Sequence, residues 1–397
     1  MTRRAAALVG VVVMAVAGQL FAQSIESPRI PPVTDRQLTD QQRALVASYV
    51  RGGVLTNDIR TLLNHPDAIP GVMPFWNYIT FESTLSPHDR TVLMLRTAWL
   101  SNSSYLWGKY TNAASALSPA DVARLTSPIV TGTAFDDVLV RMADGLHRRS
   151  FVDEETWSAL KTKYETEQLM DAVFTVAESS MLATMFNSLR VPLDAGFGGA
   201  GAVMATATAG NRDHPVLSTP RIPPLEQTFW TGELRALLDP DATGRPIAAV
   251  YRTFANHPAL YRPRQDLSEY IRLKSTLPDR ARELAILRIG FLCGSEYEWA
   301  AHAPAGRAAG LTTAEVGRIA NGSNGWSGTD VAILDAVDEL FARDMVSDAT
   351  WARLAASFDR RQLIDVLITA GGYRMVSMAL NTFGVPLETG SERMPGR

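Results

Sequence analysis

The stretch Asp279-Arg-Ala-Arg-Glu-Leu-Ala-Ile-Leu-Arg288 indicates the fold of this 397-residue chain. It begins with an aspartate suited to capping a helix, and its apolar residues are spaced three and four positions apart, as in an α-helix with one buried face. Leu311-Thr-Thr-Ala-Glu315 is a capping-box pattern that marks another helix start, and Ser347 marks a third. Long alternating patterns typical of strands are absent. We therefore predict an all-α fold.

The helical pattern occurs twice along the chain. Arg29-Ile-Pro-Pro32 recurs as Arg221-Ile-Pro-Pro224, and Asn64-His-Pro66 recurs as Asn256-His-Pro258, each 192 residues later. Towards the end of each copy the offset becomes 194. This period is far too long for a solenoid and predicts two tandem modules. The predicted divisions are a signal peptide at 1–22, a degenerate first domain at 25–194, a Gly/Ala-rich linker at 195–213, and a second domain, with the site, at 214–390.

Charge and composition restrict the classes of partner. The chain has 38 basic and 41 acidic side chains, a formal net charge of −3, and no basic stripe interleaved with aromatic residues. This balance gives no argument for nucleic acid, so the charge leaves a small molecule or a protein as the partner, and we predict a small-molecule substrate.

The first 24 residues have the pattern of an export signal. Arg3 and Arg4 precede an apolar or small run from Ala5 to Leu20, and Ala22 is suited to cleavage. We expect a periplasmic or secreted protein that leaves the membrane once the signal is cleaved, with an uncleaved anchor as the alternative. Cys293 is the only cysteine, so the chain has no internal disulfide.

The segment from Ser295 to Ala308 carries the candidate chemistry. Ser295, Glu298 and His302 are spaced i, i+3 and i+7, which places them on one face of a helix. A carboxylate one turn from an imidazole is suited to acid/base chemistry. Glu283 lies on the preceding helical stretch and can converge on the same space. The alternative is a solvated surface pair of Glu298 and His302.

The two copies differ at these four positions. Residues alike in both copies, such as Arg288 and its counterpart Arg96, are expected to serve the shared fold, although Arg288 also stays a candidate for holding an acidic substrate. Tyr297 and Trp299 are expected mainly to pack, with substrate binding as the alternative. The catalytic candidates Glu283, Ser295, Glu298 and His302 align with Thr91, Ser103, Leu106 and Tyr110. Any active site is therefore predicted in the second copy.

Other kinds of site have weak support in this region. No second histidine lies at metal-ligand spacing from His302, so no metal is predicted. Ser295 lacks the Gly-x-Ser-x-Gly context of a hydrolase nucleophile, and no phosphate-cradling glycine loop follows a strand. We predict no cofactor.

The segments Arg282–Arg288, Gly294–His302 and Arg307–Leu311 resemble the carboxymuconolactone decarboxylase family, which includes the AhpD-like alkylhydroperoxidases. The likeness covers about 170 residues of the second copy, and the first copy is a degenerate version. The resemblance implies two tandem AhpD-like helical bundles, and it implies a ring-shaped homo-oligomer. Because each chain already holds two copies, we favour a trimer.

In the peroxidase branch of that family, a relay glutamate precedes a Cys-x-x-Cys pair and a histidine follows it. The resemblance places the glutamate at Glu283 and the histidine at His302, while the two cysteine positions hold Ser295 and Glu298. Dithiol peroxide reduction therefore has no thiols at these positions. We predict a cofactor-independent decarboxylase, lyase or isomerase acting on a small lactone or carbonyl acid. The alternative is an exported helical binding or assembly protein without catalysis.

Overall fold

The computed structural model describes residues 27–50, 54–113, 117–127, 134–198 and 214–396. Every regular element in these residues is helical, with 18 α-helices and several short 3₁₀ and π turns, so the all-α prediction is confirmed. The predicted signal at 1–22 and most of the predicted linker at 195–213 lie outside the described residues.

The helices of the two halves follow one another in the same order. The first half contains α1 (Asp40–Val46), α2 (Asn57–Leu62), α3 (Ile69–Asn77), α4 (Pro87–Leu100), α5 (Ser104–Ala113), α6 (Pro119–Arg124), α7 (Phe135–Arg149), α8 (Glu154–Leu160) and α9 (Thr166–Leu189). The second half contains α10 (Gly232–Leu238), α11 (Ala249–Phe254), α12 (Pro258–Glu269), α13 (Asp279–Leu292), α14 (Glu296–Ala308), α15 (Thr313–Arg318), α16 (Gly328–Arg343), α17 (Asp348–Ala355) and α18 (Arg360–Phe383). Helices α11 to α18 repeat α2 to α9, while the domain boundaries themselves stay a prediction.

A π turn lies at the same place in each half, directly after α3 and after α12. The turns span Tyr78–Glu82 and Tyr270–Lys274. Three short 3₁₀ turns complete the regular structure, at Pro66–Ala68, Gln227–Phe229 and Ile319–Asn321.

The helix starts follow most of the capping signals. Thr312 and Glu315 form the predicted capping box, and the Ser347 hydroxyl accepts from the Thr350 backbone N–H. The prediction that Asp279 caps α13 was wrong. Pro278 takes the cap position, and Asp279 lies in the first turn, where its carboxylate pairs with Arg282 at 2.9 Å.

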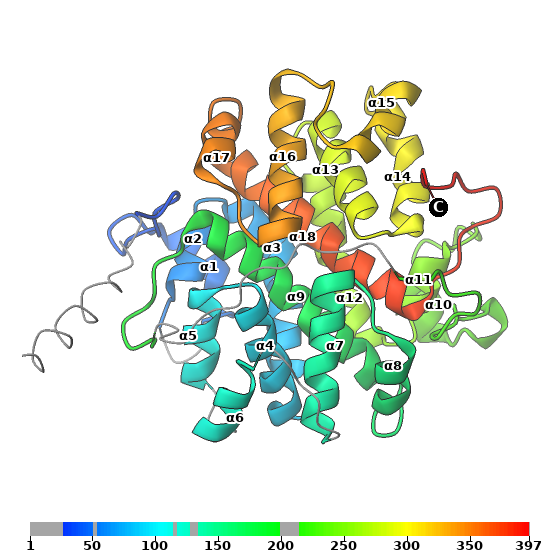
Figure 1. Ribbon diagram of the computed structural model, residues 1–397, viewed down its shortest axis with the longest axis horizontal. Helices are drawn as coiled ribbons and strands as arrows, with labels where there is room; N and C mark the ends of the chain where they lie inside the picture. The colour runs from blue at the N-terminus through cyan, green and yellow to red at the C-terminus, as the bar shows by residue number, and fades with distance from the viewer. Residues whose placement is uncertain (1–26, 51–53, 114–116, 128–133, 199–213, 397) are drawn as a thin grey trace, which may run out of the picture.

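The two longest helices, α9 and α18, run through the middle of the molecule (Figure 1). Helices α13 to α17 lie on one side of this pair and α4 to α8 on the other. Both α9 and α18 have the length and apolar composition of a membrane span, yet each is wholly buried among other helices, as expected for the centre of a packed core.

Buried hydrogen bonds join the two halves at equivalent positions. His65 Nε2 lies 2.8 Å from the Tyr270 hydroxyl and 3.2 Å from Asp365 Oδ2, so a first-half histidine meets two second-half residues. Thr276 donates to the same Asp365 carboxylate. The equivalent network in the other direction consists of His257, Tyr78, Asp171 and Thr84. These contacts support the expectation that residues alike in both copies serve the shared fold.

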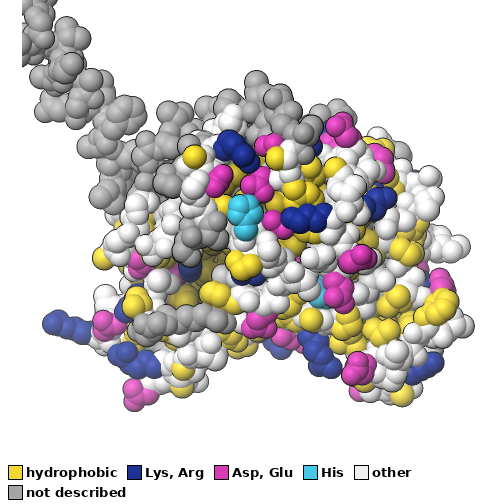
Figure 2. All heavy atoms as spheres, turned by 90° about the horizontal axis from the view of Figure 1, so that it is seen from below, with side chains coloured by type: hydrophobic (Ala, Val, Ile, Leu, Met, Phe, Trp, Pro, Cys, Tyr) yellow, Lys and Arg dark blue, Asp and Glu magenta, His cyan; other side chains and the backbone are white. Residues whose placement is uncertain are grey.

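Acidic and basic side chains intermingle on the face shown in Figure 2, with apolar side chains between them. Among the described residues of this face, side chains of the two signs alternate without forming a broad band of one charge.

Candidate functional site

Two glycines let α13 and α14 pack closely enough to bring their polar side chains together. A Cβ atom on Gly290 of α13 would lie 3.1 Å from Glu298 Cβ of α14. A Cβ atom on Gly306 of α14 would lie 3.0 Å from a Leu287 methyl group. Both separations are tighter than ordinary side-chain contacts, so larger residues would push the helices apart. This close approach lets Glu283 of α13 reach His302 of α14.

His302 lies between two carboxylates. Its Nδ1 atom is 2.8 Å from Glu283 Oε2, and its Nε2 atom is 3.5 Å from Glu298 Oε2. The exposed fraction of the side chain is 13% for His302 and 7% for each glutamate, so a solvated surface pair is the wrong interpretation. The predicted convergence of Glu283, Glu298 and His302 is present in the structure.

The buried surroundings change the protonation of this cluster. Burial raises the pKa of Glu298, and the charge of Glu283 adds to the rise, whereas His302 and Arg264 oppose it. The Tyr373 ring meets the His302 ring edge-on, with centroids 4.9 Å apart. Burial, with help from the two glutamates, raises the pKa of Tyr373 well above its ordinary value. Tyr373 therefore keeps its proton and can act as a hydrogen-bond donor.

A cavity of about 320 Å³ lies beside this cluster, which is a volume suited to a small molecule. Helices α11, α12, α14 and α18 form its walls. Glu298 and His302 both line it, so the acid/base pair faces the space directly. Its other polar lining includes Arg264, Arg272, Tyr251, Tyr297 and Tyr373. Tyr297 also lines this cavity, and its role in substrate binding stays a prediction.

Ser295 and Trp299 do not line this cavity, so Ser295 is not placed to act on a ligand there, and Trp299 packs as mainly expected. Ser295 is the N-cap of α14, where its fully buried hydroxyl faces the Glu298 backbone N–H. Trp299 is buried in the core, with its ring centroid 6.0 Å from that of Phe291. The first residue stabilises the helix start, and the second packs the far side of α14.

Arg288 is also not positioned to hold a substrate. Its guanidinium pairs with Asp338 at 2.5 Å and 3.0 Å and donates to the carbonyl oxygens of Ile319 and Ala320. Arg96 makes the same type of contact with Asp144 in the first half. The predicted role of Arg288 in the shared fold is the one that these contacts support.

Sequence reasoning missed Arg264, Arg272, Tyr251 and Tyr373. A signal for three of them exists in the repeat, because Arg264, Arg272 and Tyr373 align with Val72, Thr80 and Ser179. A comparison extended to every position that differs in charge or size between the copies would have found them.

Cys293 lies outside the cavity wall and ends α13. It is fully buried, and burial raises the pKa of its thiol to about 11. The thiolate needed for peroxide chemistry is therefore disfavoured at neutral pH.

A second cavity, of about 240 Å³, lies between the start of α14 and the end of α18. His214 lines it, but its ring stacks on Phe151 and its Nε2 atom lies 3.1 Å from the Cys293 carbonyl oxygen. Glu296 in the same wall pairs with Arg393 at 3.0 Å. These polar groups contact one another, so this cavity is a weaker candidate for chemistry.

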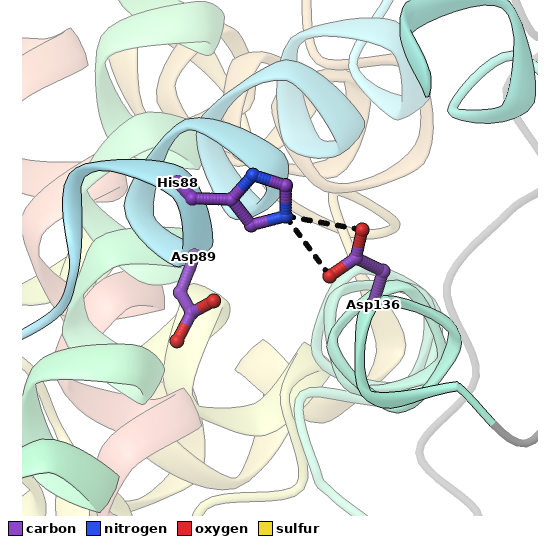
Figure 3. A group of neighbouring side chains, drawn as sticks. All are labelled: His88, Asp89 and Asp136. Carbon is purple, nitrogen blue, oxygen red and sulfur yellow. Dashed lines mark hydrogen bonds and ion pairs between the residues drawn. The ribbon is translucent and has the colours of Figure 1, made fainter. Parts of the chain in front are cut away.

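One group in the described part of the chain has ligand atoms close enough for a cation: His88, Asp89 and Asp136. Figure 3 shows His88 directed at Asp136, with both contacts 3.1 Å long. Lys163 lies 3.3 Å from the Asp89 carboxylate, and Arg124 lies 3.5 Å from that of Asp136. Because basic side chains already neutralise both carboxylates, a metal would have to displace them.

Residues 258–339 match the carboxymuconolactone decarboxylase family. The match supports the resemblance in the second half, and it contains Arg264, Glu283, Glu298 and His302. No curated protein sequence matches the chain.

Proposed function

We propose that the chain is a cofactor-independent acid/base enzyme, a decarboxylase, lyase or isomerase, acting on a small lactone or carbonyl acid. The observation that carries this proposal is the position of His302, which has a buried carboxylate at each ring nitrogen and faces a cavity of about 320 Å³. Proton transfer to or from carbon needs an acid and a base positioned beside the substrate, and Glu298 and His302 both line the cavity.

In the proposed mechanism, Glu283 accepts a hydrogen bond from His302 Nδ1 and fixes the orientation of the ring. His302 Nε2 then exchanges a proton with Glu298, whose raised pKa favours the protonated form. In a decarboxylation, the bond to the leaving carboxylate breaks, the electron pair enters the adjacent carbonyl as an enolate, and carbon dioxide departs. Glu298 supplies the proton that the carbon then takes up. Tyr373, rather than Ser295, donates a hydrogen bond to the enolate oxygen, because Tyr373 lines the cavity and Ser295 does not.

An isomerisation uses the same groups in a different sequence. The Glu298–His302 pair removes a proton from the carbon next to the carbonyl, leaving the enolate. The pair then returns a proton to another carbon of the conjugated system. Both reactions require a dry cavity, since water would compete for the proton.

The proposal is tested by screening the mature protein against small lactones and β-keto acids. His302→Asn and Glu298→Gln should each lower kcat/KM by about 10²–10⁴-fold, while circular dichroism stays unchanged. Tyr110→Phe, at the position matching His302 in the first half, is the control and should leave turnover intact. If His302→Asn retains most of the activity, the acid/base assignment is wrong and the non-catalytic binding protein becomes the better hypothesis.

The location and assembly of the chain are part of the same proposal. We propose export through the signal at residues 1–22 and assembly of three chains into a ring of six modules, as the family resemblance implies. Mass spectrometry of protein recovered outside the cytoplasm tests the cleavage. Light scattering at micromolar concentration tests the assembly, and a monodisperse monomer would contradict it.

A further inference from the structure

Arg264 is a buried cation without a paired anion. It lies on α12, has an exposed fraction of 7%, and lines the cavity beside His302. Among the described residues, its guanidinium has no hydrogen bond and no ion pair. A guanidinium carries five N–H donors and keeps its charge in proteins, so burying it without an acceptor is costly.

The other deeply buried arginines of this fold are paired. Arg96, Arg288 and Arg374 contact Asp144, Asp338 and Asp344 respectively. Glu298 is the carboxyl group whose charge acts on Arg264. Its raised pKa favours the neutral form, so Glu298 is a weak counter-ion for the guanidinium. The Phe254 ring lies 4.7 Å from the guanidinium carbon and stabilises a cation by its π face, without satisfying the N–H donors.

The fold itself does not require a cation at this position. The matching residue of the first half is Val72, which is buried in the equivalent helix α3. Arg264 is therefore an addition to the second half, and it occurs where the cavity and the acid/base cluster occur. Such a residue is better explained by a ligand than by packing.

We infer that Arg264 binds a carboxylate of the substrate, and that this carboxylate survives the reaction. This inference rests on the proposed function and names the class of substrate: a small lactone or ketone that carries a separate carboxylate. The planar guanidinium fork matches a carboxylate with two parallel hydrogen bonds. A carboxylate lost as carbon dioxide gives up its negative charge, so a cation holding it would oppose the reaction. The group on Arg264 must therefore be the one that stays.

A measurable consequence follows for Glu298. In the free protein the charge of Arg264 lowers the pKa of Glu298 and partly offsets the effect of burial. A bound carboxylate neutralises Arg264 and adds a negative charge, so the pKa of Glu298 should rise further. Substrate binding should then be accompanied by proton uptake, which prepares Glu298 as the proton donor.

The test measures binding of two carboxylates, propionate and 4-oxopentanoate, against their neutral amides at constant ionic strength. The wild-type protein should bind each acid roughly 10- to 100-fold more tightly than its amide, as a charge-assisted pair implies. Arg264→Met should reduce this ratio to near one. Arg264→Lys keeps the positive charge but loses the two parallel N–H donors of the guanidinium, so it should give an intermediate ratio. This variant replaces Arg264→Met in the test if the methionine variant does not fold. Arg262→Met, which removes an exposed arginine of the same helix that does not line this cavity, is the matched control and should leave the ratio unchanged.

Calorimetry in two buffers of different ionisation enthalpy measures the proton uptake. Uptake in the wild-type protein and none in Arg264→Met is the expected result. Equal binding of acid and amide by the wild-type protein, or a ratio that persists in both Arg264 variants, would overturn the inference. Binding to His302→Asn separates this result from the proposed function: the acid should still bind that variant, so failed catalysis and failed carboxylate binding give different outcomes.

Discussion

The cavity beside His302 and the matching region of the first half are built on equivalent helices but are filled differently. Three small residues, Ser268, Ala301 and Gly372, line or border the second-half cavity and have Trp76, Lys109 and Glu178 as their counterparts. Trp76 is buried, and Lys109 Nζ lies 4.5 Å from the centroid of its ring. One scaffold can thus hold a polar cavity or fill the same space with side chains.

The two halves also differ in which helix supplies the buried carboxyl group. In the second half, Glu298 on α14 faces the imidazole of His302, whereas in the first half the position of Glu298 holds Leu106 and an acid comes from α9 instead. Within the described residues, the Glu178 carboxylate has no hydrogen-bond partner, and neither has the Tyr110 hydroxyl. The first half keeps buried polar groups without the arrangement that would let them exchange a proton.

The largest effect is expected when the second-half cavity is filled as the first half is. Ser268→Trp places the first-half residue in the wall of the cavity and should abolish 4-oxopentanoate binding, a loss of about 100-fold or more, because the indole occupies the ligand volume. Titration calorimetry measures the loss, and Ser268→Ala is the control that should bind normally. Unchanged binding by a folded Ser268→Trp protein would show that the ligand site lies elsewhere.

The next prediction concerns the buried acid of the first half. Burial raises the pKa of Glu178 well above its ordinary value. The unfolded chain therefore ionises at lower pH than the folded one, and the free energy of unfolding should fall as the pH rises above about 4.5. Glu178→Gln should remove this part of the pH dependence of the free energy of unfolding. The variant should therefore be more stable than the wild-type protein at pH 8.

Urea unfolding at pH 5 and pH 8 measures the effect. The exposed Glu155→Gln on α8 is the control and should leave the pH dependence as it is in the wild-type protein. Identical pH dependence in Glu178→Gln and the wild-type protein would mean that Glu178 is hydrated or paired.

A smaller effect is expected at the networks that join the halves. Burial alone would raise the pKa of Asp365, but hydrogen bonds from His65, Tyr270 and Thr276 outweigh it and the pKa is lowered. The ionised Asp365 carboxylate therefore stabilises the folded protein above pH 3.8, the ordinary pKa of the group. This stabilisation is lost as the pH falls through the lowered pKa of the folded state. Asp365→Asn should cost about 1–3 kcal/mol at pH 7 and less at pH 3.

Urea midpoints at the two pH values measure this change, and Asp171→Asn tests the equivalent network in the other direction. Similar losses in both variants would show that the two halves contribute alike to their interface. A neutral effect of Asp365→Asn at pH 7 would contradict the role given to the network.

The sequence predicts the helices well because their signals are local. The capping box at Thr312 and the cap at Ser347 depend on residues three positions apart, and the repeat reveals itself by direct comparison. Glu298 and His302 were predictable for the same reason, since one helical turn separates them.

The remaining parts of the site depend on how distant helices pack. Arg264 belongs to α12 and Tyr373 to α18, and nothing in their own neighbourhoods shows that they share a cavity with His302. Ser295 has the correct spacing but is used by its own helix as a cap, so spacing alone could not separate a cap from a catalytic group. For Asp279, the preceding Pro278 changes the start of the helix by one residue.

The smallest effect is expected at Cys293, where Cys293→Ser should leave kcat/KM unchanged. The matching residue of the first half is Ser101, which ends α4 as Cys293 ends α13, and both are fully buried. Asn187 donates to the Ser101 carbonyl oxygen at 2.8 Å, and Asn381 donates to that of Cys293 at 2.9 Å, so the backbone role is the same in both halves. A hydroxyl in place of the thiol therefore enters a setting that the fold already accommodates. The measurement is kcat/KM together with the urea midpoint, which separates loss of chemistry from loss of stability. If turnover disappears in a stable Cys293→Ser protein, the thiol takes part in the reaction, and the proton-transfer assignment to Glu298 and His302 has to be replaced by one that includes Cys293.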